Sequence, residues 1–174
     1  MFWRVSEPNA YLSQWYPSAF KDTSGETWSC AEQYMMYHKA MFFQDATTAT
    51  AILSATCADP RYYKRMGRAV KDFDMSKWLL VCDRIVLEGN LYKFAQSRGL
   101  LRALLSTGDK LIIEASPLDR LWGIGYDTSN AMCHASKWGE NKLGCILMKV
   151  RAALQSDVVF NDYNIKQKYV GFGD

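Results

Sequence analysis

The segment from residue 28 to residue 43 carries apolar side chains on nearly every side of its predicted helix, which indicates a helix inside the protein. It nevertheless contains Glu32 and Lys39, two residue types that are rarely buried without a partner. They lie about two helical turns apart, so they project from nearly the same side, about 10 Å apart along the axis. A carboxylate and an amine on one side of a buried helix indicate a chemical site.

Hydrophobic spacing and capping residues predict that most of the remaining chain is helical. The longest periodic segment begins at Asp74, and Gly89 lies on its apolar stripe. We interpret Gly89 as a site of close helix approach, while two helices in place of one stay possible there. Further helices are predicted over residues 45–55 (capped by Asp45), 59–67 (opened by Asp59-Pro60), 97–106 and 142–155.

Few strands are expected, and the predicted fold is mainly α, or α+β with a few short strands, in one compact domain over residues 1–174. Strand candidates cover residues 2–5, 27–28 and 110–115, the last being the best. The aromatic loop 6–27 and the apolar tail 156–174 are expected to pack on the body.

The composition indicates a globular protein whose net charge of +3 permits an anionic ligand but suggests no large nucleic-acid footprint. Five cysteines without CxxC spacing and two histidines assemble no zinc pattern, so we expect reduced thiols and no metal or cofactor. No signal peptide opens the chain, and no apolar run is long enough to span a membrane. These features favour a cytosolic or nuclear location.

Two candidate carboxylates also have structural explanations. Ser29 and Glu32 fit a capping box, in which the carboxylate bonds back to the start of its helix, and Ser116 and Asp119 fit a second one. The capping and chemical roles are not exclusive. Lys39 has no comparable explanation except that it bends out to solvent.

Together the polar groups suit cleavage of an N-glycosidic bond. A carboxylate can stabilise positive charge on the sugar or activate water, an acid can protonate the leaving base, and a lysine can attack a sugar carbon to form a Schiff base. Tryptophans can stack on a base, and Lys64 or Arg68 can hold phosphate. The alternatives are a solvated helix face for the basic residues and core or turn roles for the tryptophans and glycines.

A series of motifs follows in order along residues 2–155: Trp15-Tyr-Pro-Ser-Ala-Phe20, Ala31-Glu-Gln-Tyr-Met-Met-Tyr-His-Lys-Ala40, Lys64-Arg-Met-Gly-Arg68, Trp78, Lys93-Phe94, Leu105-Ser-Thr-Gly-Asp109, Glu114-Ala-Ser-Pro-Leu-Asp-Arg-Leu-Trp-Gly-Ile-Gly125, Trp138-Gly-Glu-Asn-Lys-Leu-Gly144, Leu147-Met148 and Arg151. With these motifs the chain resembles the NADAR family, also called the YbiA-like family. The resemblance implies a compact, mainly helical YbiA-like fold and N-glycosidase chemistry.

The resemblance also implies two substrate classes and a set of site residues. Members of the family act on phosphorylated intermediates of riboflavin biosynthesis or on ADP-ribose attached to guanine. The family often has Ser-Asn where this chain has Ser13-Gln14, which could shift ligand contacts in that loop. The matched positions are Glu32, Lys39 and Asp119 as polar catalytic residues, Lys64 and Arg68 as a basic motif that could meet phosphate, and Trp122, Gly123, Gly125, Trp138, Asn141 and Gly144 as ligand-lining residues.

Three functions are therefore distinguished. The first is a glycosidase that removes ADP-ribose from guanine, free or in DNA or RNA, with Lys39 as the nucleophile or the cation that engages the ribose. Glu32 and Asp119 would share acid/base work. The second is the same chemistry on a riboflavin-pathway intermediate, and the third is a non-catalytic module that binds NAD or ADP-ribose. No membrane partner is expected, and the oligomeric state stays open.

Overall fold

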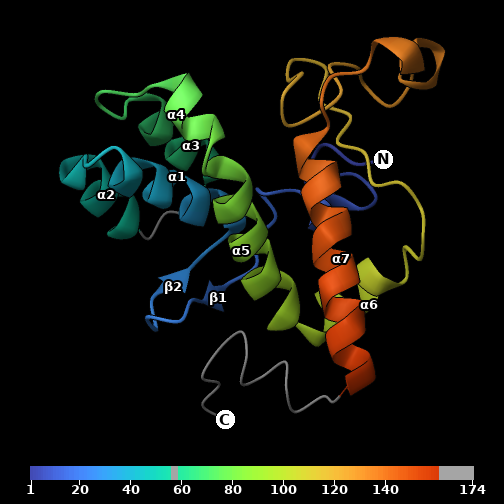
Figure 1. The fold of residues 1–174 in the computed structure, drawn as a ribbon, viewed down its shortest axis with the longest axis horizontal. Helices are drawn as coiled ribbons and strands as arrows, with labels where there is room; N and C mark the ends of the chain where they lie inside the picture. Colours follow the sequence, from blue (N-terminus) through green and yellow to red (C-terminus); the bar gives the residue numbers. More distant parts are fainter. Residues whose placement is uncertain (56–58, 161–174) are drawn as a thin grey trace.

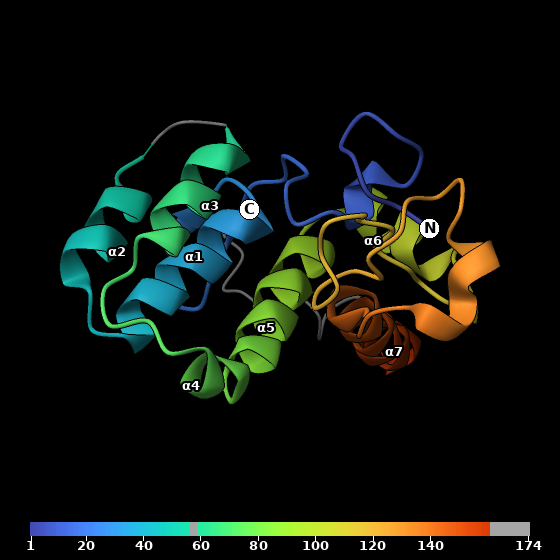
Figure 2. The ribbon, with the colours of Figure 1, turned by 90° about the horizontal axis from the view of Figure 1, so that it is seen from above.

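Helix α1 (Ala31–Phe42) runs through one half of the molecule, where α2 (Ala46–Leu53) and α3 (Pro60–Arg68) pack against it (Figure 1). Helix α5 (Cys82–Ala95) lies between α1 and α7 (Lys142–Phe160), as Figures 1 and 2 both show. The fold is therefore mainly helical, as predicted. The remaining elements are the helices α4 (Met75–Leu79) and α6 (Arg98–Leu105), the 3₁₀ helices η1 (Ala10–Leu12) and η2 (Met132–Lys137), and the strands β1 (Phe20–Lys21) and β2 (Thr27–Trp28).

This computed structural model describes residues 1–55 and 59–160, with the backbone alone for 157–160. The predicted packing of the tail over 156–174 thus falls almost wholly outside the described residues, as does Cys57. Among the other cysteines, Cys30 and Cys82 are buried and free. No helix in the described part of the chain is both long and apolar enough to cross a membrane.

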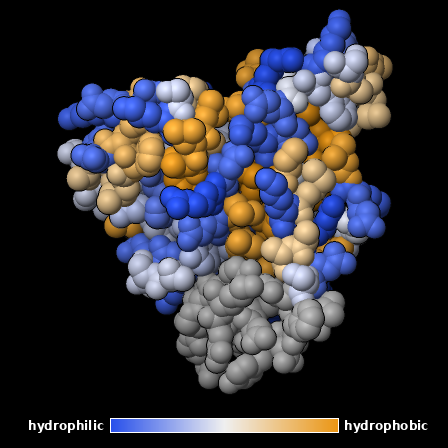
Figure 3. All heavy atoms as spheres, viewed as in Figure 1, coloured by the Kyte–Doolittle hydropathy of each residue, from blue (hydrophilic) through white to orange (hydrophobic). Residues whose placement is uncertain are grey.

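Helix α1 is buried along most of its length, as its apolar pattern predicted. Trp28, Tyr34 and Met36 belong to one large apolar core that also takes in the inward face of α7. Figure 3 shows apolar side chains gathered along the seam between the two groups of helices. Glu32 and Lys39 are buried with this helix, at 6% and 9% exposure, so their charges need a local explanation.

The helix caps predicted at Asp45 and Asp59 are confirmed, and a third cap that was not predicted is found at Ser97. The Asp45 side chain accepts a hydrogen bond from the backbone N–H of Thr48, which starts α2, and Asp59 accepts one from Arg61 at the start of α3. Ser97 does the same for α6. These short polar side chains satisfy backbone donors that would otherwise lack a partner in the first turn.

The periodic segment that begins at Asp74 forms two helices, but they are divided at Val81 and not at Gly89, so the alternative of a break at Gly89 is wrong. Asp74 caps α4, and the chain leaves helical geometry at Val81 before α5 begins. Gly89 has the role expected of it, because a Cβ atom there would lie 2.7 Å from the ring of Tyr34 on α1. The absence of a side chain at Gly89 lets α5 approach α1 closely.

The strand prediction over residues 110–115 is wrong apart from one bridge, Phe2 to Glu114. The reason is that a loop satisfies the backbone of this segment in place of a second strand. The Asn141 side chain bonds the N–H of Glu114 and the carbonyl of Ile112, and the N–H of Ile124 bonds the carbonyl of Glu114. The strand predicted at residues 27–28 is confirmed as β2, and it pairs antiparallel with β1, which lies within the predicted loop 6–27. Of the strand predicted over residues 2–5, only the bridge at Phe2 is found.

Candidate active site

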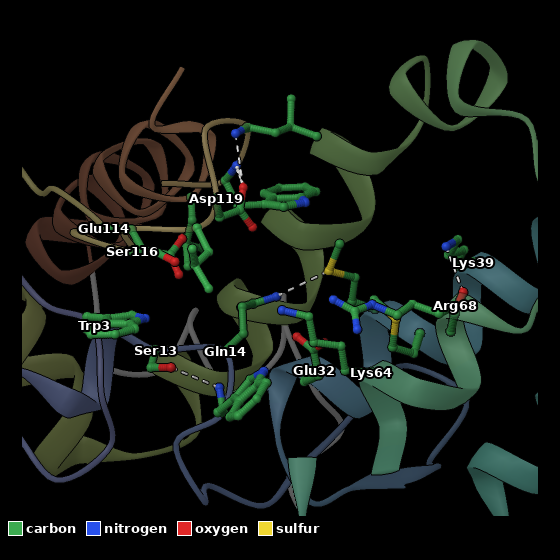
Figure 4. A pocket seen from close by; sticks show the side chains of 18 of the residues that line it. Trp3, Ser13, Gln14, Glu32, Lys39, Lys64, Arg68, Glu114, Ser116 and Asp119 are labelled. Atoms are coloured by element: carbon green, nitrogen blue, oxygen red, sulfur yellow. Dashed lines mark hydrogen bonds between the residues drawn. The ribbon is translucent and has the colours of Figure 1, made fainter. Parts of the chain in front are cut away.

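A cavity of about 880 Å³ lies between α1, α3, α4 and the loops that carry residues 3–6, 13–15 and 114–122. Figure 4 shows its polar side chains, with Glu114 and Asp119 on one side, Glu32 and Lys64 in the middle and Arg68 and Lys39 on the other. Six of the predicted site residues line this cavity: Glu32, Lys39, Lys64, Arg68, Asp119 and Trp122.

Glu32 faces the cavity because it does not cap its helix. The predicted capping box is wrong: α1 starts at Ala31, and Gln33 accepts the hydrogen bonds from the backbone N–H and the hydroxyl of Ser29, each 2.8 Å long. The N–H of Glu32 instead donates to the carbonyl of Gln14 over 3.0 Å. The neighbouring glutamine takes the local structural role, so the Glu32 carboxyl group is available to a ligand.

Asp119 does not cap a helix either, because residues 116–122 form turns and no helix follows Ser116. Its Oδ1 accepts hydrogen bonds from the N–H groups of Leu121 and Trp122, at 3.0 and 2.8 Å. An aspartate that bonds the backbone two and three residues ahead tightens a turn. This turn directs both Asp119 and Trp122 to the cavity.

Glu114 is a third carboxyl group in the cavity, and the sequence reasoning did not select it as a site residue. Its Oε2 is buried and has no hydrogen-bond partner among the described residues. The signal that could have found it is the one that singled out Glu32, a lone carboxylate within an apolar run. A buried carboxyl oxygen without a partner on a cavity wall is suited to contact a ligand.

Burial and mutual proximity make two of these carboxyl groups easy to protonate. Burial raises the pKa of Glu114 to about 8, with further increases from Asp119 and Glu32 and a decrease from Lys64. Burial also raises the pKa of Glu32 to about 7, although Lys64 and a hydrogen bond from Trp15 lower it. The cavity therefore holds acids that can give up a proton near neutral pH.

Lys39 lies at the far end of the cavity from Glu114. Its ammonium donates a 2.7 Å hydrogen bond to the carbonyl of Gly67 and lies 3.8 Å from the centre of the Phe73 ring. Burial lowers the pKa of Lys39 to about 8, while Glu32 raises it and Arg68 lowers it. A lysine in this state has some free amine at neutral pH, which a nucleophile requires.

Cations and aromatic rings border the carboxyl groups. The ammonium of Lys64 lies 5.5 Å from the centre of the Trp15 ring, and it is the cation that acts on both Glu32 and Glu114. Arg68 lines the cavity one helical turn further along α3. The site thus offers positive charge and stacking surfaces beside a group of acids.

The other five predicted site residues lie outside the cavity lining, and their contact with a ligand stays a prediction. These five residues shape the wall behind the cavity lining. Asn141, at φ +51°, holds the backbone on both sides of Ile113, and a Cβ on Gly144 would lie 2.2 Å from the carbonyl of Ile112. The same wall contains Gly123, whose Cβ would lie 2.8 Å from the Glu114 carbonyl, Gly125 at φ +76°, and Trp138, whose indole donates to the Ala131 carbonyl.

The arrangement can support acid–base chemistry at a sugar carbon. Three carboxyl groups provide a proton donor, a proton acceptor and negative charge beside a developing cation, while Lys64 and Arg68 can bind phosphate. Within the described residues, no three His, Cys, Asp or Glu side chains are grouped so as to hold a metal ion.

Comparison with known proteins gives concordant matches. The family model described as NADAR domain matches residues 1–155. The protein named N-glycosidase R617 of Acanthamoeba polyphaga mimivirus is 43% identical over 146 residues, which cover 80% of this chain and 85% of that protein. The riboflavin biosynthesis protein VVA0006 of Vibrio vulnificus (strain YJ016) is 29% identical over 160 residues, 92% of this chain and 40% of that protein. The NMR structure of the E. coli protein YbiA has a TM-score of 0.75 at 25% identity and covers 92% of this chain and 86% of its own, which confirms the YbiA-like fold.

Proposed function

This chain belongs to the NADAR domain family and is an N-glycosidase, and we propose that it hydrolyses the bond between the ribose of an ADP-ribosyl group and guanine. The observation that carries this proposal is the group of carboxyl side chains, Glu32, Glu114 and Asp119, on the wall of a cavity whose other end holds Lys39 and Arg68. The carboxyl groups extend from one end of the cavity to its middle, and the cations extend from the middle to the other end. This order matches a substrate with a labile glycosidic bond at one end and a pyrophosphate further along.

The reaction needs one acid and one base. As the bond between the sugar carbon and the guanine nitrogen breaks, a protonated carboxyl group transfers its proton to that nitrogen. Glu114, with its pKa raised to about 8 by burial and by Asp119 and Glu32, is the best acid of the group. A water molecule then bonds to the sugar carbon and loses a proton to a carboxylate, for which Glu32 and Asp119 are the candidates.

Lys39 has two roles in this proposal, which differ in their chemistry. As a nucleophile, its free amine attacks the sugar carbon as the base leaves, and ring opening gives a Schiff base that water later hydrolyses. This role places the bond between Lys39 and Glu32, so Glu32, and not the distant Glu114, would give its proton to the leaving base. As a cation, it stays protonated and binds the oxygens of the ribose or of the adjacent phosphate. The amine role requires Lys39 to leave the Gly67 carbonyl, to which it is bonded over 2.7 Å.

The rest of the cavity suits the ADP portion. Its volume of about 880 Å³ lies in the range of sites that enclose nucleotide-sized ligands. Lys64 and Arg68 can bind the pyrophosphate, and the rings of Trp15 and Phe73 offer faces for a base. DNA and RNA can each present the guanine, since these contacts involve the ADP-ribosyl group.

The test is incubation with ADP-ribosylated guanosine, followed by chromatography for free ADP-ribose and guanosine. The proposal predicts both products with the native chain and at least about 100-fold slower formation of both with Glu32→Gln. Tight binding of ADP-ribose by calorimetry, with no product over a long incubation, would instead identify a non-catalytic binding module.

The second candidate substrate is a phosphorylated intermediate of riboflavin biosynthesis, which the name of the Vibrio vulnificus relative favours. It would use the same acids and would place one phosphate near Lys64 and Arg68. A side-by-side assay with equal concentrations of both substrates separates the candidates. A higher kcat/KM for the riboflavin intermediate would overturn the first proposal in favour of the second.

A further inference from the structure

Lys93 of α5 is a buried charge outside the cavity lining. It is 1% exposed, and its ammonium donates a 2.8 Å hydrogen bond to the carbonyl of Ser13. The rings of Tyr16 and Phe94 lie 5.7 and 5.0 Å from it, and no carboxylate forms an ion pair with it in the described part of the chain. A buried lysine without a carboxylate is costly, and an apolar side chain of similar length would fill the same space more favourably.

The group that Lys93 holds belongs to a wall of the cavity. Ser13, Gln14 and Trp15 are consecutive, and all three line the cavity. Asn90, one turn earlier on α5, donates a 2.8 Å hydrogen bond to the side-chain oxygen of Gln14. Helix α5 therefore holds this segment at two successive residues, through one backbone group and one side chain.

The same segment is bonded to Glu32. The carbonyl of Gln14 accepts the N–H of Glu32 at the start of α1, and the Trp15 hydrogen bond lowers the pKa of the Glu32 carboxyl group. A displacement of residues 13–15 would therefore move the backbone at Glu32 and change the environment of its carboxyl group.

We propose that Lys93 is a positioning residue, whose buried ammonium fixes the Ser13–Trp15 segment and through it the orientation and acidity of Glu32. The groups that face the ammonium are the Ser13 carbonyl, the Tyr16 and Phe94 rings, and the thiol of Cys30 before α1. Burial lowers the pKa of Lys93 to about 7 and Cys30 opposes this shift, so the charge of Lys93 is sensitive to pH near neutrality.

The test compares Lys93→Met, Lys93→Arg and the control Lys149→Met, which removes an exposed lysine from α7. We expect Lys93→Met to melt at the native temperature or above, because a buried charge is removed. Its kcat should fall about 10- to 100-fold at nearly constant KM, as for a catalytic group displaced by about 1 Å. Lys93→Arg should recover part of kcat, and Lys149→Met should match the native chain.

A direct readout is the pKa of Glu32, followed by carbon-13 NMR of the labelled carboxyl group in each variant. It should rise in Lys93→Met, because the Trp15 hydrogen bond that lowers it is weakened. An unchanged Glu32 titration together with native kcat overturns the inference, and so does a loss of stability that parallels the loss of turnover. If Lys93→Met does not fold, Lys93→Gln is titrated in its place, and a Glu32 pKa that stays at its native value in that variant overturns the inference.

The turnover part of this test rests on the proposed function, whereas the NMR titration does not. A native chain that cleaves neither substrate, with a Glu32 pKa that still moves in Lys93→Met, refutes the proposed function and supports the role of Lys93. An active native chain whose Glu32 titration and kcat are unaffected by Lys93→Met supports the proposed function and refutes the role of Lys93.

Discussion

Gln33 accepts two hydrogen bonds from Ser29, one from its backbone N–H and one from its hydroxyl, both over 2.8 Å. Its amide nitrogen donates a third to the carbonyl of Ile52. Gln33 thus ties the start of α1 to the preceding chain and to α2. Its neighbour Glu32 makes none of these bonds and faces the cavity, so structure and chemistry are divided between two adjacent residues.

This division predicts opposite effects of two similar substitutions. Glu32→Gln should reduce kcat at least about 100-fold, as expected for an acid–base residue, and change the free energy of unfolding by less than about 1 kcal/mol. Gln33→Leu should lower the free energy of unfolding by about 2–4 kcal/mol, because it leaves buried partners unsatisfied, with a smaller effect on kcat. Urea unfolding and steady-state kinetics on both variants check this. Equal stability losses would contradict the division.

Glu114 predicts a pH dependence of stability with a definite sign. Its folded pKa of about 8 lies above the ordinary value of 4.5, so between these pH values the folded protein holds a proton that the unfolded chain has lost. The contribution of protonated Glu114 to the free energy of unfolding is therefore fully present below pH 4.5. It is lost as pH rises to about 8, by up to about 1.4 kcal/mol per pH unit.

The measurement is the difference in free energy of unfolding between the native chain and Glu114→Gln across this window, since groups that do not interact with Glu114 cancel in the difference. The native advantage should decline with rising pH. If Glu114 is also the acid, native kcat should fall above about pH 8, and Glu114→Gln should lose this alkaline decline together with most of its activity. A difference independent of pH would show that Glu114 is ionised throughout.

Lys39 predicts a trapped adduct if its amine is the nucleophile. Sodium borohydride added during turnover should attach the sugar to Lys39, and trapping should increase as pH approaches its pKa of about 8. Peptide mass spectrometry locates the adduct. Lys39→Arg should form none; if Lys39 acts only as a cation, this variant should keep a measurable part of kcat, and the native chain should not be trapped.

Lys64 and Arg68 predict a phosphate subsite. Replacing either with alanine should raise KM about tenfold with a smaller change in kcat, because charge-assisted hydrogen bonds to phosphate are lost. The control is Arg65→Ala on the same helix, since Arg65 is exposed, packs near the Tyr62 ring and does not line the cavity. A similar KM for all three variants would place the phosphates elsewhere.

Asn141 predicts a loss of stability, whether or not it contacts a ligand. Asn141→Ala removes both bonds to the segment that carries Glu114 and puts alanine at φ +51°, so the free energy of unfolding should fall by about 2–4 kcal/mol. Asn141→Gly tolerates this φ and should recover part of the loss. Thermal unfolding of the two variants measures the difference. Equal losses would mean that the two hydrogen bonds alone account for the effect.

The helices were predictable because their signals are local. Asp45, Asp59 and Ser97 start helices in the way that their sequence neighbours indicate, and the stripe through Gly89 describes a real contact with α1. The capping boxes failed because the same pattern admits a competitor. At α1 the adjacent glutamine takes the bond from four residues after Ser29, a position that the three-residue spacing of the capping box does not include.

The site was only partly predictable because it is built from contacts between distant segments. Glu32 and Lys39 were found from burial on one helix, a property of local sequence. Glu114 and Lys93 were not selected as candidate site residues because the partners that hold their segments lie far along the chain: Asn141 for the first and Ser13 for the second. The predicted strand at 110–115 failed for the same reason.

The burial of Lys39 has a consequence for covalent inhibitor design. A lysine with a pKa of about 8 offers far more free amine at neutral pH than an ordinary surface lysine, and Lys39 lines an open cavity. Lys93 is also easily deprotonated but is 1% exposed and away from that cavity, so a reagent has no path to it. A mild aldehyde carried by an adenine-like group should therefore label Lys39 in preference to Lys93 and to ordinary surface lysines, which would make Lys39 an anchor for covalent probes of this cavity.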